Sequence, residues 1–422
     1  MEAGRTKNKI RILYINHESG IAGAGLSLAY LIREINREEY EPVIACDLRH
    51  SLAREFFRSE GFVPYDLKVR RFSHTSLSSW PVYSPYGLMA LTRWFTCQFP
   101  AGRKALKELL RKISPDIVHL NSVTLLPYAP TIRKEGISVV LHVREPVIRG
   151  LFGIRRAWLR WLGRNAVDAI IYICEDNRLR LTGNHPKGKV IYNFVAFDKF
   201  DRNIDQQKAR QQFGIPCNRK VLLFPGGSKS SVKGIFPLLD ALVNLRKQFP
   251  DLVCLMPGAA SRSPVKLGWL KSVLLRLLFA EPKIKPRIKK LKLENILMRT
   301  AFSYEVEKFY AACDIVVIPF VVPHFARPVI EAGAMVKAVV ASRVGGVEEV
   351  VKDGVTGLMV EPGNAEDLAE KITILLNDST LAEKLGEGGY KQARRLFDAK
   401  LNAVATMKVY EEVLKNKRKH NV

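Results

Sequence analysis

Short apolar runs alternate with longer amphipathic stretches along nearly the whole chain, and this alternation is what most restricts the fold. Strands that alternate with helical patterns are typical of a parallel sheet covered by helices on both faces. In the first half the predicted strands are Ile10–Ile15, Pro42–Cys46, Ile117–Leu120, Val139–His142, Ala169–Ile173 and Lys189–Ile191. We therefore predict an α/β protein with doubly wound, Rossmann-like sheets.

The pattern restarts after a polar interval, which indicates two such units in the 422 residues. The second set of predicted strands is Val221–Phe224, Leu252–Met256, Ile296–Met298, Ile315–Ile318, Ala338–Ala341 and Gly357–Val360. The interval 196–219 is charged and shows little periodicity, as expected of a linker. We predict domains at 1–195 and 220–397, a linker at 196–219, and a helix at 398–422 that crosses back onto the first domain.

The chain is strongly basic, with a net charge of +26. Much of the excess lies in Lys68–Ile113, Arg149–Arg164 and Arg262–Arg299. Such a charge favours an anionic partner, and nucleic acid, anionic lipid and a phosphorylated substrate all qualify. In Arg149–Arg164 arginines recur every four residues among Leu, Ile and Trp, which predicts an interfacial helix on an anionic membrane. An ordinary surface helix has the same period.

The six cysteines form no CxxC pair and no cluster with histidine, so the sequence disfavours a zinc site or a disulfide framework. The most apolar stretch, Leu267–Ala280, carries two basic residues and falls short of the roughly 20 residues that a membrane span needs. We predict a cytoplasmic protein that can attach peripherally to the inner face of the cytoplasmic membrane.

Glycine-rich turns follow the first predicted strand of each half. Gly23 and Gly25 come after Ile10–Ile15, and Gly227, Ser228, Lys229 and Lys233 come after Val221–Phe224. Backbone N–H groups at a helix start and nearby lysines are suited to binding a diphosphate. Each turn is also compatible with a simple tight or solvated turn. The dinucleotide fingerprint GxGxxG is incomplete, although Asp47 sits where a dehydrogenase would hold a ribose.

A third group of polar residues follows the strand Ile315–Ile318. It comprises His324, Arg327 and Glu331, with the turn Gly345-Gly346 further on. Glu331 lies near the start of a helix that Pro328 can open. Its carboxylate could accept hydrogen bonds from both hydroxyls of a ribose, or it could simply interact favourably with the positive end of the helix dipole.

In combination these motifs resemble glycosyltransferase family 4 (group 1), a family of retaining enzymes. The similar segments are Asp116–His119, Leu141-His142, Val190–Asn193, Lys233-Gly234, Glu331-Ala332, Gly345–Glu349, Asp353–Gly357 and Glu361–Gly363. The resemblance implies the GT-B fold, in which two Rossmann-like domains face each other across a cleft. The N-terminal domain then binds the acceptor, and the C-terminal domain binds a nucleotide-sugar donor.

The resemblance also implies roles for individual residues. Catalytic roles fall to Lys233, Lys229 and His142. Donor-binding roles fall to Gly23, Gly25, Gly227, Ser228, His324, Arg327, Glu331, Gly345 and Gly346. Acceptor-side roles fall to His119, Asn121, Arg144 and Glu145. No metal or other cofactor is expected.

Three positions depart from the family pattern. Pro323 stands where the family has the first of two glutamates, so His324 and Arg327 are predicted to take over part of its role. Ser228 stands where the family has a phosphate-binding arginine, and Asn121 where it often has a histidine.

We predict a hexosyltransferase that moves a sugar from a nucleotide diphosphate to a glycan or lipid-linked acceptor in polysaccharide or lipopolysaccharide synthesis. The alternatives are an inactive glycosyltransferase-like binding protein, a GT-B epimerase, and a basic nucleic-acid-binding protein. A nucleic-acid partner is disfavoured, because the sequence has no recognition motif for one.

Overall fold

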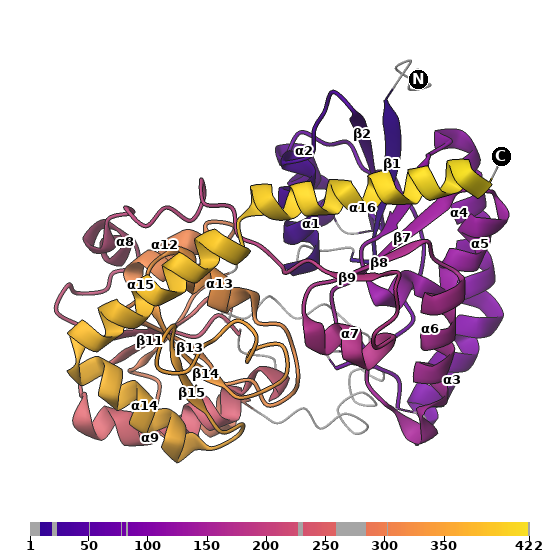
Figure 1. Cartoon of the computed structure of the whole chain (residues 1–422). Helices are drawn as coiled ribbons and strands as arrows, with labels where there is room; N and C mark the ends of the chain where they lie inside the picture. The colour runs from indigo at the N-terminus through magenta and orange to yellow at the C-terminus, as the bar shows by residue number, and fades with distance from the viewer. Residues whose placement is uncertain are drawn as a thin grey trace. The chain divides into compact units, whose positions relative to one another are not determined.

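The computed structural model describes residues 9–18, 23–49, 51–76, 78–81, 83–226, 231–258, 284–301 and 303–420. The chain forms two compact units. Unit 1 contains Met1–Phe194 and Leu396–Val422, and unit 2 contains Val195–Arg395. Unit 2 is therefore an insertion within unit 1 in terms of chain order, and the C-terminal segment belongs to the first unit (Figure 1).

Unit 1 is built on a parallel sheet of seven strands in the order β3-β2-β1-β6-β7-β8-β9. The strands are β1 (Ile10–Asn16), β2 (Tyr40–Cys46), β3 (Tyr65–Asp66), β6 (Ile117–Leu120), β7 (Ser138–Val143), β8 (Ala169–Tyr172) and β9 (Gly188–Val190). A short antiparallel pair, β4 (His74–Thr75) and β5 (Ser78–Ser79), lies outside this sheet. The strand order reverses between β1 and β6, and ligands of such sheets bind at the carboxyl ends of the strands beside that reversal.

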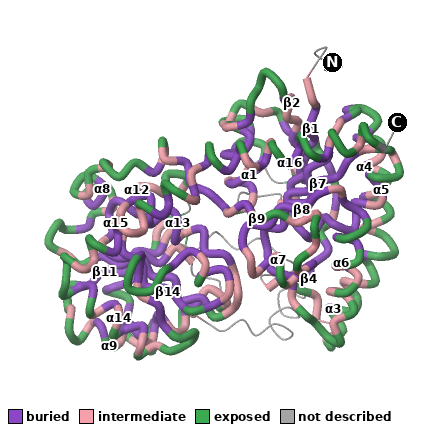
Figure 2. Tube along the Cα trace, in the orientation of Figure 1, coloured by how far each residue is buried: buried purple, intermediate pink, exposed green. Residues whose placement is uncertain are grey.

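Helices cover the sheet of unit 1, and its strands form the buried centre of the unit (Figure 2). The helices are α1 (Gly23–Arg33), α2 (Ser51–Ser59), α3 (Pro85–Arg93), α4 (Phe99–Ile113), α5 (Ala129–Lys134), α6 (Ile154–Asn165), α7 (Glu175–Leu181) and α16 (Ala399–His420), with shorter turns η1 (Trp94–Gln98), η2 (Val123–Tyr128) and η3 (Leu151–Gly153). The C-terminal helix α16 packs against α1, β7 and β8. It thereby completes the hydrophobic cover of this sheet.

Unit 2 repeats the same plan with a parallel sheet of six strands in the order β12-β11-β10-β13-β14-β15. The strands are β10 (Val221–Leu223), β11 (Val253–Met256), β12 (Leu297–Arg299), β13 (Ile315–Ile318), β14 (Ala338–Ser342) and β15 (Leu358–Val360). The helices are α8 (Gln206–Gln212), α9 (Ile235–Gln248), α11 (Ile284–Lys290), α12 (Val306–Ala312), α13 (Arg327–Ala334), α14 (Ala365–Asn377) and α15 (Ser379–Leu396), with the turn η4 (Ser231–Lys233). The strand order reverses between β10 and β13.

The segment 196–219, predicted as a linker, is part of unit 2. Its helix α8 packs against α12. Buried Arg210 donates a hydrogen bond of 2.7 Å to Asp314, and the rings of Phe213 and Phe309 stack with centroids 4.6 Å apart. The segment lacks periodicity because a few specific contacts, rather than an apolar face, hold it in place.

Two segments of unit 2 are hard to recognise from the sequence. The stretch after the glycine turn Gly345-Gly346 forms further turns and no helix. The long helix α15 was not predicted, because Gly386, Gly388 and Gly389 lower its helix propensity. These glycines allow close packing: a Cβ added at Gly386 would lie 2.3 Å from the carbonyl oxygen of Val336, and one at Gly388 would lie 2.1 Å from that of Val355. No helix within the described residues is long and apolar enough to cross a bilayer, and Leu267–Ala280 lies outside them.

Candidate functional site

In unit 2, Lys233 is the last residue of the turn η4, which lies between β10 and α9 in the chain. The following residue, Gly234, has a φ of +77°, and a Cβ there would lie 1.6 Å from the carbonyl oxygen of Pro319. The N–H of Val321 donates to the carbonyl of Val232 at 3.1 Å, which ties this turn to the end of β13. Burial lowers the pKa of Lys233. A partly desolvated ammonium group thus lies at the carboxyl ends of β10 and β13, and it is suited to an anionic ligand.

His324 is the next polar residue at this edge. Burial, reinforced by the charge of Lys233, lowers its pKa to about 3, so the imidazole is neutral near pH 7. The backbone N–H of His324 donates to the carbonyl of Gly345 at 3.1 Å, and Gly346, with φ +84°, leaves only 3.1 Å between an added Cβ and the carbonyl oxygen of His324. The glycine turn therefore fixes the His324 loop. A neutral imidazole there is suited to a hydroxyl group.

Glu331 on α13 is buried and held on both carboxylate oxygens. The hydroxyl of Tyr310 donates to Oε2 at 2.7 Å, and Arg327 Nε donates to Oε1 at 2.7 Å. Each oxygen has a second lone pair that a ribose hydroxyl could use. Sequence reasoning missed Tyr310, because a tyrosine in the helix before β13 looks like any core aromatic. Gly227, Ser228 and Lys229 lie outside the described residues.

In unit 1 a buried chain of rings runs from β1 through α16 to β7. Nδ1 of His142 lies 3.2 Å from Nε2 of His119, and Nδ1 of His119 lies 2.7 Å from the hydroxyl of Tyr410. That hydroxyl lies 3.2 Å from the hydroxyl of Tyr14. Burial, reinforced by Arg144, lowers the pKa of His119 to about 3 and that of His142 well below its ordinary value. Both histidines are therefore neutral.

This chain gives His119 a supporting position. Both of its ring nitrogens are occupied, and its side chain is fully buried, so it supports His142 and has no free nitrogen to offer an acceptor. His142 is also buried, and its Nε2 has no hydrogen-bond partner among the described residues.

Arg144 and Asn121 brace the same edge of the sheet. Arg144 Nε donates to Asn121 Oδ1 at 2.7 Å, and Arg144 Nη1 donates to Asn193 Oδ1 at 3.2 Å. Asn121 Nδ2 in turn donates to Asn16 Oδ1 and to the carbonyl of Ala24, both at 3.1 Å. These contacts join the ends of β1, β6 and β7 to the start of α1.

The two glycines of the first turn are not required by steric crowding. A Cβ added at Gly23 would meet nothing within 4 Å, and one at Gly25 would make contacts of 3.6 Å, an ordinary separation. α1 begins at Gly23, so the N-terminal N–H groups of this helix lie near the carboxyl end of β1.

Glu145 forms a polar cluster with two neighbours. Ser122 Oγ donates to Glu145 Oε2 at 2.9 Å, and His17 Nε2 lies 3.6 Å from Oε1. Burial raises the pKa of Glu145 to about 7 and lowers that of His17 to about 3. Sequence reasoning missed His17, although a polar residue directly after the first strand of such a sheet is itself a signal of a ligand site.

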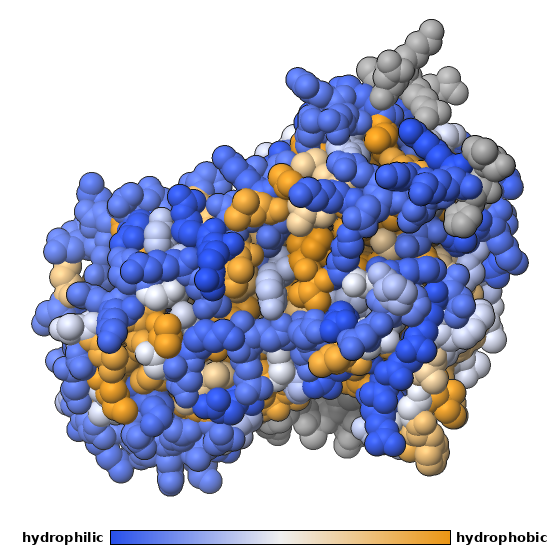
Figure 3. Space-filling view, viewed as in Figure 1, coloured by the Kyte–Doolittle hydropathy of each residue, from blue (hydrophilic) through white to orange (hydrophobic). Residues whose placement is uncertain are grey.

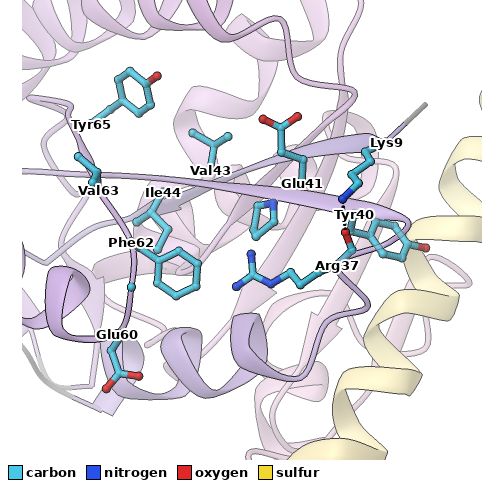
Figure 4. Close-up of a pocket in the computed structure, with 12 residues that line it drawn as sticks. Lys9, Arg37, Tyr40, Glu41, Val43, Ile44, Glu60, Phe62, Val63 and Tyr65 are labelled. Atoms are coloured by element: carbon cyan, nitrogen blue, oxygen red, sulfur yellow. Dashed lines mark hydrogen bonds between the residues drawn. The ribbon is translucent and has the colours of Figure 1, made fainter. Parts of the chain in front are cut away.

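Two hollows of unit 1 lie at different places on its sheet. One, of about 750 Å³, is lined by His17, Glu18, Asp47, Arg49, Val69, Arg70, Arg71, Ser73, Ser78, Ser79, Trp80, Tyr86, Met89, Ala90, Arg93 and Gln98. The other, of about 590 Å³, lies beside β2 (Figure 4). There Arg37 lies over the ring of Phe62 at 4.9 Å, and Lys9 donates to the carbonyl of Arg37. Lys9 and Tyr40 stand at the amino ends of β1 and β2, so this second hollow is remote from the ligand edge.

Among the described residues, no group of three or more His, Cys, Asp or Glu side chains is arranged to hold a metal ion. The expectation of metal-free chemistry stays a prediction.

Two family models match the chain. "Glycosyl transferases group 1" matches residues 205–392, and "Glycosyltransferase Family 4" matches residues 21–199. An uncharacterised glycosyltransferase of Methanocaldococcus jannaschii is 36% identical over 132 residues, or 29% of this chain and 37% of that protein. The lipopolysaccharide 1,2-N-acetylglucosaminetransferase of Salmonella typhimurium is 29% identical over 231 residues, 54% of this chain and 56% of that protein. The chain thus spans less than two thirds of either relative.

The fold has solved counterparts. Anabaena HepE, crystallised with UDP and glucose, superposes with a TM-score of 0.74 at 20% identity and covers 95% of this chain and 99% of its own. This similarity establishes the GT-B fold, in agreement with the two parallel-sheet units. The two family matches together span most of the chain, so the chain belongs to the family 4 (group 1) glycosyltransferases.

Proposed function

We propose that this chain transfers a hexosyl group from a nucleotide diphosphate sugar to a glycan or lipid-linked acceptor. The observation that carries the proposal is the grouping of Lys233, His324 and Glu331 at the carboxyl edge of the unit 2 sheet, beside its point of reversal. The ammonium of Lys233 suits a diphosphate, and the neutral imidazole of His324 suits a sugar hydroxyl. The fixed carboxylate of Glu331 suits a ribose.

Each group has a distinct task in the proposed reaction. Lys233 neutralises the diphosphate as it leaves, with Lys229 and the N–H groups near Gly227 and Ser228 as further donors. Glu331 holds the ribose, and Arg327 and Tyr310 fix its direction. His324 replaces part of the role of the missing glutamate at Pro323, with Gly345 and Gly346 fixing its loop. The reaction uses no metal and retains the anomeric configuration, as the family membership implies.

Unit 1 supplies the acceptor side in this proposal, with His142, Arg144 and Glu145 at its ligand edge. A role in lipopolysaccharide or polysaccharide synthesis is supported by the Salmonella relative. The competing function is an inactive binding protein, which Pro323 and Ser228 favour because they replace two residues of the family pattern.

Turnover decides between these functions. The full chain is incubated with a panel of nucleotide sugars, with water or added glycan and lipid-linked acceptors to take the sugar, and release of free nucleotide is measured. Release from any of them supports transfer, while binding without release supports the inactive protein. Lys233→Ala should lower kcat more than it lowers donor affinity, because the charge of Lys233 matters most as the leaving group forms. Equal losses in both would contradict its assignment to the transition state.

We further propose peripheral attachment of unit 1 to the inner face of an anionic cytoplasmic membrane. Phe152 in η3 and Ile154 and Trp161 in α6 are exposed apolar side chains. Arg160 and Arg164 of the same helix donate to the carbonyls of Leu181 and Thr182, so they are anchored to the protein. The outward side of α6 is thus more apolar than the basic face that its sequence period predicts.

Liposome co-sedimentation tests this attachment. We expect pelleting with vesicles that contain anionic lipid, and a marked loss in the double variant Phe152→Ser with Trp161→Ser. The matched control is Leu401→Ser, an exposed leucine of α16. Equal, negligible pelleting with neutral and anionic vesicles at low salt would leave these side chains a purely structural role.

A further inference from the structure

The 750 Å³ hollow of unit 1 has a positively charged lining that the donor-side residues do not use. It contains four arginines, Arg49, Arg70, Arg71 and Arg93, against two carboxylates, Glu18 and Asp47. The hollow therefore carries two more positive than negative side chains, which favours an anionic ligand.

Asp47 already neutralises part of this charge. Its two oxygens accept hydrogen bonds from Arg49 Nε at 2.8 and 2.7 Å, and Arg70 Nη1 lies 3.4 Å away. Arg71 and Arg93, by contrast, make no ion pair with any residue that the structure describes. Their guanidinium groups are thus available to a phosphate, which arginine binds with two parallel hydrogen bonds.

The rest of the wall suits the oxygens of a phosphorylated head group. Ser73, Ser78 and Ser79 contribute hydroxyl-bearing side chains, and Trp80 contributes an aromatic ring. His17 also lines the hollow; its side chain is 4% exposed, and its Nδ1 has no hydrogen-bond partner among the described residues. The same side chain lies 3.6 Å from Glu145, so the hollow adjoins the polar cluster at the ends of β1 and β7.

An apolar groove of about 500 Å³ runs along the adjacent face of α3. It is lined by Pro85, Leu88, Met89, Thr92, Arg93, Thr96 and Cys97. Leu88 and Met89 are 55% and 63% exposed, and the hydrophobic colour over the α3 end of unit 1 is visible at the lower right of Figure 3. Met89 and Arg93 line both the groove and the charged hollow, so the two meet at α3.

We propose that the charged hollow and the groove together bind an amphiphilic acceptor whose head group carries a phosphate. The phosphate lies against Arg71 and Arg93, and the hydrocarbon chain lies along Leu88 and Met89. A free glycan would leave the apolar groove unused, and a neutral lipid would leave the two arginines unpaired. The assignment rests on the proposed glycosyl transfer and adds the chemical class of its acceptor.

Calorimetric titration of the full chain tests the head-group site. The probes are dodecyl phosphate below its micelle-forming concentration, dodecyl maltoside as a neutral amphiphile, and inorganic phosphate. We expect dodecyl phosphate to bind at least tenfold more tightly than either of the others. Arg71→Ala and Arg93→Ala should each weaken it by about tenfold or more. The control Arg111→Ala, an exposed arginine of α4, should change nothing.

A double variant tests the groove. Leu88→Ser combined with Met89→Ser should weaken dodecyl phosphate by about tenfold while leaving inorganic phosphate unchanged. Leu401→Ser, whose exposure of 54% matches that of Leu88, is the control. Equal binding of dodecyl phosphate and inorganic phosphate would overturn the proposal, since the groove then holds no chain. Equal affinity for dodecyl maltoside and dodecyl phosphate would overturn it as well, because the arginines then do not distinguish a charged head group from a neutral one.

Nucleotide release, measured with water and with added glycan and lipid-linked acceptors to take the sugar, separates this proposal from the proposed function. If the chain releases no nucleotide from any nucleotide sugar but binds dodecyl phosphate as expected, the transfer activity is wrong and the amphiphile site remains. If it releases nucleotide but does not prefer dodecyl phosphate, the acceptor class is wrong and the transfer activity remains.

Discussion

The hydroxyl of Tyr410 lies 2.7 Å from Nδ1 of His119, although 291 residues separate the two in the chain. Tyr410 belongs to the C-terminal helix α16, and His119 belongs to β6 in the middle of unit 1. Because His119 contacts His142 with its other ring nitrogen, the last helix of the chain helps to fix the ring nearest the ligand edge.

Tyr410→Phe should therefore affect catalysis as well as stability. The variant leaves Nδ1 of His119 without its partner, which should cost about 1–3 kcal/mol of unfolding free energy. If His142 acts in transfer, kcat should fall by about tenfold to 100-fold, because small displacements of a reacting group are costly. Donor affinity in unit 2 should stay unchanged. Steady-state kinetics and urea unfolding measure the two effects.

Tyr40→Phe provides the matched control for that experiment. Tyr40 is buried, with its ring 6.1 Å from that of Tyr410, but its hydroxyl makes no hydrogen bond within the described part of the chain. This control should keep its kcat. A similar loss of kcat in both variants would show that packing, rather than the contact with His119, is responsible.

Glu331→Gln should weaken nucleotide binding. The amide keeps the shape of the side chain but removes the charge that a ribose hydroxyl would meet, a loss of roughly 1.5–3 kcal/mol for a charged hydrogen bond. Calorimetry with the nucleoside diphosphate measures the effect, and Glu383→Gln, an exposed site on α15, is the control. Unchanged affinity in a folded Glu331→Gln variant would refute the ribose assignment.

Gly234→Ala should destabilise unit 2 more than Gly354→Ala. Both glycines have positive φ, +77° and +70°, so both variants incur backbone strain of about 1–2 kcal/mol. Only Gly234 also faces a carbonyl oxygen, at 1.6 Å from the added Cβ, whereas Gly354 faces open space. The clash should add about 1–3 kcal/mol. Urea unfolding of the two variants compares them, and equal losses would mean that the Lys233 turn adapts freely.

The buried carboxyl of Glu145 should make stability depend on pH. Its pKa is about 7 in the folded chain, above the ordinary value of 4.5. Between these values the folded state holds a proton that the unfolded state has released, so the unfolding free energy falls as pH rises. Glu145→Gln removes this dependence. Relative to wild type, the variant should gain on the order of 3 kcal/mol between pH 4.5 and pH 8. Parallel stability curves for the two proteins would contradict the buried, raised pKa.

The strands could be predicted from the sequence more accurately than the site. The bounds predicted for β6 and β13 match the structure, because short apolar runs in a parallel sheet are distinctive. The positions of Lys233 and Glu331 at a strand edge or helix start could likewise be inferred from local pattern and resemblance.

Contacts between distant segments could not be inferred. Tyr410 looks like one more residue of an amphipathic helix, and Arg71 and Arg93 look like ordinary members of a basic segment. Their significance depends on which segments the fold brings together. For the same reason the sequence predicts an acceptor-side role for His119. The histidine can be seen in the sequence, but the contact between its Nδ1 and the hydroxyl of Tyr410 cannot.

Because α16 closes the sheet of unit 1 after the whole of unit 2 has been passed, the order of synthesis on the ribosome matters for this protein. Unit 2 has all of its residues when residue 395 has been added, but unit 1 lacks the helix that contributes Tyr410 until the residues after 395 have followed. The first unit to emerge therefore completes its fold only after unit 2 has been synthesised, and until then its sheet lacks the cover that α16 provides. Premature termination within the last helix should accordingly damage the N-terminal unit and spare the one that precedes the stop.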